Sequence, residues 1–543
     1  MSQPTSTSRY SRVALALAVV VWTVVVGHYR SSLGLMADDW LFITSNMDRG
    51  AEGFLMPYAE HILILFGLVY RSFLEVFGLS MAASFNIFAM FMNVVAVVAV
   101  FMYLRRLVGD VTALIGALVL LFLGASYDQL LWSFQSCFAL SIAAGIGGLI
   151  LLRREGRFTD LFACLALSAS VMALTLGLSF AVAALLAILL ADGARRRIHV
   201  ALIPLGIFCL WYLGWGTSGE GYVSVENLIH TPVYVLDAFG YSLRVMTGTF
   251  RIGGDVGTWI GRGLAVAALL AIGIQVGRRR QLPASLLVGL AAGITFWGLA
   301  GLNQVLPLRT FDQSRYQFPS VVFTLMILGG GFEGVKLAVR FQICMAAVAV
   351  AAIWINCLAL ADGYRDELKP NSDRSLASVI SLDLMGPDAV DGSLEVPVDH
   401  LNILKMDAAS YFAARDRFGS GLWNVPDLMT QDEAVRTGVD QTIRSSLPFP
   451  VEEVESRPPG TCHQLKPGAD GKTAAVSLTG KLYFASEGRG ALMTGRFTDG
   501  EPFGIAELPA KWVRVSRPPG DHLHIPWRIS AIATRPVTIC SSD

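Results

Sequence analysis

The hydrophobic and polar positions of this chain divide it into two unlike parts. Residues 11–361 consist of long apolar runs separated by short polar stretches, whereas residues 362–543 have the mixed composition of a globular domain. Because about 20 apolar residues cross the hydrocarbon core of a bilayer, the first part predicts a polytopic α-helical membrane domain. We expect about eleven crossings, near residues 13–28, 82–104, 111–125, 132–152, 159–176, 178–192, 199–215, 259–277, 283–301, 319–338 and 341–361.

Arginine clusters mark the loops on one side of the predicted bundle. Short loops rich in Arg and Lys lie in the cytoplasm by the positive-inside rule. With eleven crossings, every cluster falls on that side. This places the amino terminus in the cytoplasm and residues 362–543 outside the cell, in a multi-pass protein of the plasma membrane. The clusters are Arg105-Arg106, Arg153-Arg154, residues 195–197, residues 278–280, and Lys336 with Arg340.

Residues 61–79 are apolar enough to cross but carry His61, Arg71 and Glu75. A charge at the centre of a bilayer is costly, and a crossing here would place Arg105-Arg106 outside. We therefore expect an amphipathic helix at the outer surface. A true crossing, with one later crossing removed, is the alternative.

An acidic pair, Asp38 and Asp39, directly follows the first predicted span, and Trp40 comes next. One carboxylate could accept a proton from an incoming hydroxyl, as a general base does. The other could orient that hydroxyl or hold a divalent cation, so the need for a cofactor stays open. Alternatively, both are solvated carboxylates that cap a helix. Trp40 could flank a sugar, although the interfacial aromatic belt is the favoured place for it.

Polar residues in the other outward segments are further candidates for a substrate pocket. Glu60 and His61 could bind a metal or relay a proton, although surface hydrogen bonding is the favoured interpretation. Gln135, near the start of a span, is costly to leave unpaired in lipid, so we expect it to face the interior of the bundle. Tyr316 lies in a polar stretch before a later span.

Arg309 and Arg315 flank Asp312 in that same stretch. A guanidinium group offers paired donors that suit a lipid phosphate, which makes both arginines candidates for donor binding. The alternative is that they pair with Asp312 or with ordinary lipid headgroups.

The carboxyl-terminal part predicts two segments. Residues 362–461 are mixed, with a Pro-rich linker near their end. Residues 462–543 alternate in short strands that indicate a small β-sandwich. Cys462 and Cys540 bracket this region, and an oxidising exterior favours a disulfide between them. The predicted domains are therefore 1–361, 362–461 and 462–543.

Composition narrows the function. Hydrophobic residues make up 54% of the chain and charged residues 15%, and the formal net charge is zero. Nothing in this balance indicates nucleic-acid binding. The chain carries no P-loop, HExxH, GxSxG or Rossmann fingerprint. The glycine run 329–331 inside a predicted span indicates close helix packing.

An acidic pair after the first membrane helix, in a long outer loop with a surface helix, resembles the GT-C superfamily of membrane glycosyltransferases. The Ala37-Asp38-Asp39-Trp40 motif carries the resemblance, and the stretches at 132–135 and 314–316 look like actinobacterial members. The resemblance implies an inverting transferase that moves a sugar from a polyprenyl-phosphate donor to a glycan, lipid or protein acceptor of the cell envelope. It implies that Asp38 or Asp39 is the base, and that Arg315, or else Arg309, meets the lipid phosphate.

Two other classes of function compete with this one. A transporter or flippase of a polar lipid or sugar would show polar residues at mid-membrane and broken helices in repeated halves. No internal repeat is visible, and the charged residues gather at one face, which favours an enzyme. A membrane acyltransferase or an envelope scaffold is the third class, for which His61 is a weak match.

Overall fold

The computed structural model describes residues 6–46, 49–50, 52–191, 194–219, 221–306, 309–419, 423–458, 460–498, 503–508 and 511–542. Its contacts divide the chain into two compact units. The helical unit comprises residues 1–33 and 45–369, and the C-terminal unit comprises residues 34–44 and 370–543. Residues 34–44 thus belong by contact to the C-terminal unit, although they directly follow the first apolar helix.

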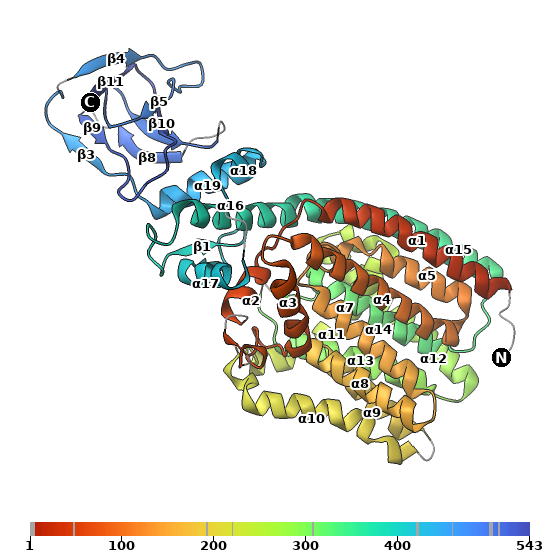
Figure 1. The fold of residues 1–543 in the computed structure, drawn as a ribbon. Helices are drawn as coiled ribbons and strands as arrows, with labels where there is room; N and C mark the ends of the chain where they lie inside the picture. The colour runs from red at the N-terminus through yellow and green to blue at the C-terminus, as the bar shows by residue number, and fades with distance from the viewer. Residues whose placement is uncertain are drawn as a thin grey trace. The chain divides into compact units, whose positions relative to one another are not determined.

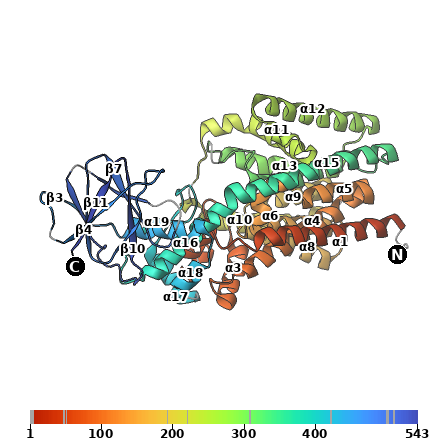
Figure 2. The ribbon, with the colours of Figure 1, turned by 90° about the horizontal axis from the view of Figure 1, so that it is seen from above.

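The helical unit is a bundle whose long helices lie side by side (Figure 1). From above, α11 and α12 lie on one side of it, and α1 and α3 on the other (Figure 2). Its helices are α1 (Ser6–Arg30), α3 (Ile64–Phe77), α4 (Ala82–Val108), α5 (Asp110–Leu121), α6 (Tyr127–Leu131), α7 (Ser136–Leu152), α8 (Arg157–Ala173), α9 (Gly177–Leu190), α10 (His199–Gly214), α11 (Val225–Thr247), α12 (Gly254–Arg279), α13 (Ala284–Leu302), α14 (Ser314–Gly331) and α15 (Val339–Gly363).

Each of the eleven predicted spans coincides with a helix. Among the described residues, five helices are long and apolar enough to cross a membrane, and a bent pair formed by α5 and residues 124–131 makes a sixth. Helices α7, α9 and α10 are apolar but shorter. The bundle is thus that of a membrane protein, and the count of eleven crossings stays a prediction.

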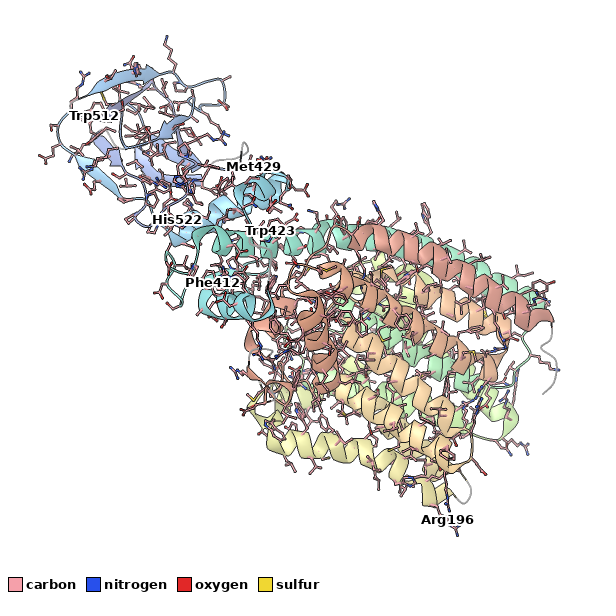
Figure 3. All side chains as sticks on the ribbon, in the orientation of Figure 1. Arg196, Phe412, Trp423, Met429, Trp512 and His522 are labelled. Carbon is pink, nitrogen blue, oxygen red and sulfur yellow. A yellow bond between two sulfur atoms is a disulfide. The ribbon has the colours of Figure 1, made fainter. Side chains whose placement is uncertain are left out.

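The predicted arginine loops gather at one end of the bundle, which we call the basic end. The Gly334 N–H donates to the Leu107 carbonyl, which joins the loop after α14 to the end of α4. The Arg153 guanidinium lies over the Tyr103 ring, 4.9 Å from its centre. Arg196 lies at this end in Figure 3. This common end is what the positive-inside rule requires, and its cytoplasmic side stays a prediction.

Helix α3 does not follow the bundle from end to end. With 14 residues it is about 21 Å long. The Phe66 ring lies 5.3 Å from that of Phe134, just before α7, and the Phe73 ring lies 5.6 Å from that of Phe85, at the start of α4. Both contacts are at the end opposite to the basic end. The position of residues 61–79 at the membrane surface stays a prediction.

Helix α14 begins earlier than expected. The predicted span covers residues 319–338, whereas the helix covers Ser314–Gly331. Pro319 lies inside the second turn of this helix, where it has no N–H for the helical hydrogen bond to the Arg315 carbonyl. Arg315 and Tyr316 therefore lie in the first helical turn, not in a loop.

The C-terminal unit combines helices with two antiparallel sheets. A four-stranded sheet has the order β5-β10-β7-β8, a five-stranded sheet has the order β3-β9-β6-β11-β4, and β1 pairs with β2 in a hairpin. The strand-rich region is confirmed, and the sandwich arrangement stays a prediction. The predicted linker contains β3, which pairs with β9. The elements are α2 (Asp38–Ser45), α16 (Lys369–Met385), α17 (Ala408–Phe418), α18 (Val425–Met429), α19 (Glu433–Ser446), β1 (Glu395–Pro397), β2 (Lys405–Asp407), β3 (Val451–Val454), β4 (Thr461–Leu465), β5 (Val476–Leu478), β6 (Lys481–Ser486), β7 (Gly490–Gly495), β8 (Phe503–Leu508), β9 (Trp512–Val515), β10 (Trp527–Ala533) and β11 (Val537–Ser542).

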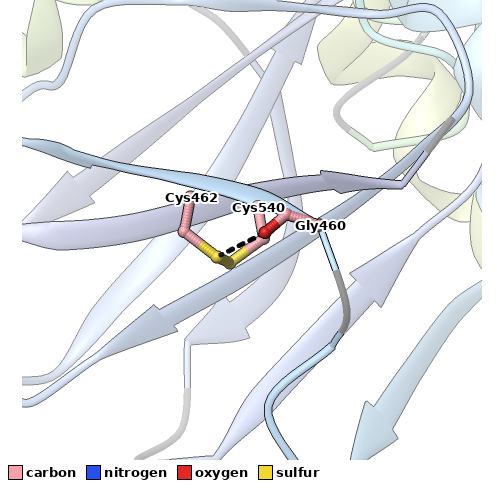
Figure 4. The surroundings of a disulfide bond; sticks show 3 residues. All are labelled: Gly460, Cys462 and Cys540. Atoms are coloured by element: carbon pink, nitrogen blue, oxygen red, sulfur yellow. Dashed lines mark hydrogen bonds between the residues drawn. A yellow bond between two sulfur atoms is a disulfide. The ribbon is translucent and has the colours of Figure 1, made fainter.

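The predicted disulfide between Cys462 and Cys540 is confirmed, with an S–S distance of 2.05 Å. The two residues face each other across β4 and β11. The Cys462 Sγ lies 3.8 Å from the Gly460 carbonyl oxygen (Figure 4). The bond ties the edge strand β4 to the rest of its sheet.

Close helix packing in the bundle depends on glycine, as the run at 329–331 predicts. A Cβ atom on Gly330 would lie 2.5 Å from the Leu286 amide nitrogen of α13. Because that neighbour is backbone, it cannot move aside as a flexible side chain can. Helices α13 and α14 therefore approach each other at a distance that only glycine permits.

We expect Gly330→Ala to lower the free energy of unfolding by about 1–3 kcal/mol, as overpacking does. Thermal unfolding in detergent measures the effect. Gly273→Ala, on α12, is the matched control, because a Cβ atom added there would meet nothing within 4 Å in the described part of the chain. Alanine there should be neutral or stabilising by up to about 1 kcal/mol. Equal transition temperatures for the two variants would contradict the packing argument.

Candidate active site

The acidic pair lies in the first turn of α2, where the helix dipole favours negative charge. Asp39 is fully buried, and its Oδ2 accepts the Met36 N–H at 3.0 Å. The Asp39 N–H in turn donates to the Met36 carbonyl at 2.9 Å. Asp38 is half-buried. The two aspartates thus differ in exposure. The Asp39 carboxylate is buried and accepts a backbone N–H of the same turn, whereas Asp38 is partly exposed at the surface.

Trp40 belongs to the core of the C-terminal unit. Its side chain is 5% exposed, and its Nε1 donates to the Leu35 carbonyl at 2.9 Å. Its ring packs edge-on against Tyr411, with centroids 5.9 Å apart. Trp40 thus packs in the core of this unit, and its place in a substrate pocket stays a prediction. Its N–H and its ring are both used inside the fold.

Glu60 and His61 form a cluster with Arg309 in the helical unit. The Glu60 Oε1 accepts a hydrogen bond from the Arg309 guanidinium and lies 3.8 Å from the His61 Nε2. The guanidinium also lies over the Tyr222 ring, 4.8 Å from its centre. About a fifth of the Glu60 and Arg309 side chains remains exposed. Arg309 therefore pairs with Glu60 and not, as one alternative held, with Asp312.

The cluster sets the charge of its members. Burial alone would raise the pKa of Glu60, but His61 and the hydrogen-bonded Arg309 outweigh it, so this pKa lies below its ordinary value. Burial lowers the pKa of His61, and Arg309 and Arg315 lower it further against the opposing effect of Glu60. His61 is thus neutral at pH 7, and Arg309 is the charge that balances Glu60 there.

Arg315 and Tyr316 begin α14 at the same end of the bundle. The Arg315 guanidinium lies 5.3 Å from the centre of the Tyr316 ring, and that ring packs edge-on against Phe296. The electrostatic effect of Arg315 on His61 shows that it lies near the Glu60–Arg309 pair. Arg309 and Arg315 thus share this end of the bundle.

Gln135 immediately precedes α7 and is 3% exposed. It faces the interior of the helical unit, as expected for an amide that would be costly in lipid. Within the described part of the chain, its Oε1 has no hydrogen-bond partner.

A group of tyrosines around Asp312 completes the polar end of the helical unit. The rings of Tyr234 and Tyr241, both on α11, pack edge-on against Phe311. Burial and the Asp312 carboxylate raise the pKa of Tyr241 to about 12 and raise that of Tyr234 further. Both hydroxyls are therefore protonated donors at neutral pH, beside an exposed carboxylate.

Neither tyrosine was predicted from the sequence as a site residue. Two charged residues of the same part of the chain, Asp237 and Arg251, form ion pairs. Asp237 accepts two hydrogen bonds from Arg262, and Arg251 pairs with Asp362. The spacing of Tyr234 and Tyr241, two helical turns apart, was the available signal, since it places both on one helical face.

An apolar hollow lies between α1, α6 and α15 in the helical unit. Its buried residues include Trp22, Val26, Leu130 and Leu360, and no charged side chain lines it. A hollow of this kind accepts hydrocarbon and excludes polar groups.

Among the described residues, no three His, Cys, Asp or Glu side chains lie close enough together to hold a metal ion. A cation bound by Asp38 and Asp39 would need ligands from its substrate or from water.

A scan of protein-family models and a search of curated proteins each find no match. A search of solved structures finds ArnT from Cupriavidus metallidurans bound to undecaprenyl phosphate, 12% identical with a TM-score of 0.43, over 76% of this chain and 85% of that one. It also finds the Archaeoglobus fulgidus oligosaccharyltransferase in complex with zinc and sulfate, 13% identical with a TM-score of 0.43, over 80% and 68%. At such TM-scores the likeness is partial, and no residue role follows from it.

The Glu60–Arg309 pair generates a prediction about stability. Removing one partner of a fully buried pair costs roughly 3–5 kcal/mol. Because this pair keeps partial solvent contact, we expect Glu60→Gln to cost about 2 kcal/mol. Since the pKa of Glu60 is lowered, the wild-type advantage is complete above the ordinary carboxyl pKa and disappears as the pH falls below about 4.

Thermal unfolding of wild type and Glu60→Gln between pH 7 and pH 3 checks this. Glu75→Gln is the control, because Glu75 is half exposed and pairs with Arg71 along one helix. Such a pair contributes about 0.2–0.5 kcal/mol. A Glu60→Gln cost no larger than the Glu75→Gln cost would refute the buried pair.

Proposed function

We propose that this protein is a membrane glycosyltransferase of the GT-C type that moves a sugar from a polyprenyl-phosphate donor to a glycan, lipid or protein acceptor outside the cytoplasm. The observation that carries the proposal is the unequal acidic pair directly after the first apolar helix. A half-buried Asp38 stands beside a buried Asp39 that holds the backbone of the same turn. A general base needs both access to its substrate and a fixed position.

In the proposed reaction, Asp38 accepts the proton of the acceptor hydroxyl. The hydroxyl oxygen then forms a bond to the anomeric carbon of the sugar, on the face opposite to the phosphate. The bond between that carbon and the phosphate oxygen breaks, and its electron pair stays on the phosphate. The configuration of the sugar is inverted. Because the lipid phosphate leaves as a stable anion, no general acid is needed.

Arg315 is the first candidate for binding the donor phosphate. A guanidinium binds phosphate oxygens through paired donors. Arg309 is the second candidate, because Glu60 already balances its charge. The two arginines lie at the end of the bundle opposite to the basic end. The apolar hollow beside α15 is suited to part of the lipid chain.

Tyr234, Tyr241 and Asp312 suit the binding of sugar hydroxyls in this proposal. The protonated phenols can donate hydrogen bonds, and the exposed carboxylate can accept them. Tyr316 and Gln135 are further pocket candidates at the same end of the bundle. His61, neutral at pH 7, can accept or donate one hydrogen bond without adding charge.

We expect Asp38→Asn to reduce transfer by about 10²–10⁴-fold, the usual range for loss of a general base. Asp38→Asn/Asp39→Asn should be inactive as well. The measurement is release of lipid phosphate by purified protein in nanodiscs, with a panel of polyprenyl-phosphate sugars and an acceptor extract. Asp388→Asn, an exposed aspartate of the same unit, is the matched control and should keep wild-type turnover.

Retained turnover in the double variant would remove the aspartates from the mechanism. Absence of turnover for every donor, with folded wild-type protein, would favour the transporter hypothesis. Uptake of a fluorescent lipid into proteoliposomes then tests that hypothesis directly.

Arg315→Ala should raise the donor KM by about 10-fold or more, since a charge-assisted hydrogen bond contributes roughly 1.5–3 kcal/mol. Arg315→Lys should recover part of the loss, because lysine keeps the charge but not the paired donors. Arg340→Ala, in an arginine cluster of the predicted cytoplasmic side, is the control and should leave the donor KM unchanged. An unchanged donor KM in Arg315→Ala would show that Arg315 does not bind the donor phosphate.

A further inference from the structure

The backbone just before the acidic pair is held by the C-terminal unit. The Gly34 N–H donates to the Ser372 Oγ of α16 at 2.9 Å. The Ala37 N–H is shared between the Ser375 Oγ of α16, at 3.2 Å, and the Val398 carbonyl after β1, at 3.0 Å. Helix α16 and the segment after β1 thus both accept hydrogen bonds from the backbone of residues 34–37.

Ala37 adopts a conformation that needs such support. Its φ of +46° lies in the left-handed region, which residues with a Cβ atom rarely occupy. Strained backbone of this kind persists where surrounding contacts over-determine it. The two acceptors for the Ala37 N–H fix the amide next to this dihedral angle.

The Ser375 hydroxyl and the Val398 carbonyl, which accept the Ala37 N–H, are themselves hydrogen-bonded and buried. The Ser375 Oγ donates to the Val398 carbonyl at 2.5 Å, so the serine and the carbonyl that hold Ala37 are bonded to each other. Ser375, Val398 and Ala37 are at most 3% exposed. Water therefore cannot replace the Ser375 hydroxyl without a rearrangement of the core.

A second anchor fixes the far side of the pair. Tyr411, which packs against Trp40, is fully buried and donates its hydroxyl to Asp383 of α16 at 2.9 Å. The Asp383 carboxylate also accepts hydrogen bonds from Arg415 and from the Trp423 N–H. Asp38 and Asp39 thus lie between two fixed points of the chain. The Ala37 amide is held by Ser375, and the Trp40 ring packs against Tyr411.

We propose that Ser375, with Ser372 and the Val398 carbonyl, is a positioning residue for the base, and that the C-terminal unit holds the Asp38–Asp39 turn in its reactive conformation. The proposal rests on the proposed function for the role of Asp38. It assigns the helical part of the C-terminal unit to the reaction itself, and not to an accessory module.

The test compares Ser375→Ala with Ser381→Ala in the full-length protein. Ser381 is also fully buried on α16, but its Oγ donates to the Ala377 carbonyl of its own helix and, at 3.4 Å, to the Val439 carbonyl of α19. We expect Ser375→Ala to lower kcat by about 10- to 100-fold, as a small displacement of a reacting group does, with the donor KM within twofold of wild type. Ser381→Ala should keep both constants.

Hydrogen–deuterium exchange supplies a readout that needs no substrate. Ser375→Ala should increase exchange in peptides that contain residues 34–41 and leave peptides of α4 and α13 unchanged. Ser381→Ala should change neither set. If Ser375→Ala does not fold, Ser372→Ala takes its place, because it removes only the bond to the Gly34 N–H.

The outcomes separate the two proposals. If Asp38→Asn abolishes turnover but Ser375→Ala and Ser381→Ala behave alike, the positioning role is overturned and the function stands. If Ser375→Ala frees residues 34–41 while no donor is turned over by wild type, the function is overturned and the grip on the segment stands. A Ser375→Ala loss that appears in the donor KM instead of kcat also overturns the positioning role.

Discussion

Hydrogen bonds from α16 and the β1–β2 hairpin to the backbone of residues 34–37 determine how the acidic pair is presented. The segment follows an apolar helix, and its residues bury little surface among themselves. Its conformation therefore comes from acceptors supplied elsewhere in the chain. The held amides adjoin two features of the turn, the left-handed Ala37 and the Asp39–Met36 hydrogen bond. The unequal exposure of the two aspartates follows from this grip.

In the helical unit, buried polar groups are either paired with an opposite charge or kept neutral. A charge in apolar surroundings is tolerated when a partner balances it, and Arg309 with Glu60 is such a case. Burial also disfavours the charged form of a side chain, which explains why His61 is neutral and why the tyrosines beside Asp312 keep their protons. Charge is thus kept low at the end of the bundle where an anionic substrate is proposed to bind, and Arg315 adds one positive group to it.

The apolar runs predicted the helices because each run must cover lipid or other helices, a requirement that is local in sequence. The start of α14 was misplaced because the polar stretch that ends at Tyr316 was expected to precede the span, although the helix begins at Ser314 and its Gln317 amide donates to the Phe311 carbonyl. The Glu60–Arg309 pair joins residues 249 positions apart, and the Ala37–Ser375 bond joins residues 338 apart. No local pattern specifies such partners. The acidic pair itself was visible from the sequence, but the roles of Trp40 and Asp39 depend on burial, which only the fold decides.

The distance along the chain between Ala37 and its holder has a consequence for biosynthesis. At about 5–20 residues per second, a ribosome needs roughly 20–70 s to pass from one to the other. Throughout that interval the first helix is already made, while the Gly34 and Ala37 N–H groups lack their acceptors on α16 and at Val398. The turn can mature only near the end of translation, after α16 and the hairpin have emerged. A chain that stops before α16 would therefore carry Asp38 and Asp39 without the acceptors that hold residues 34–37.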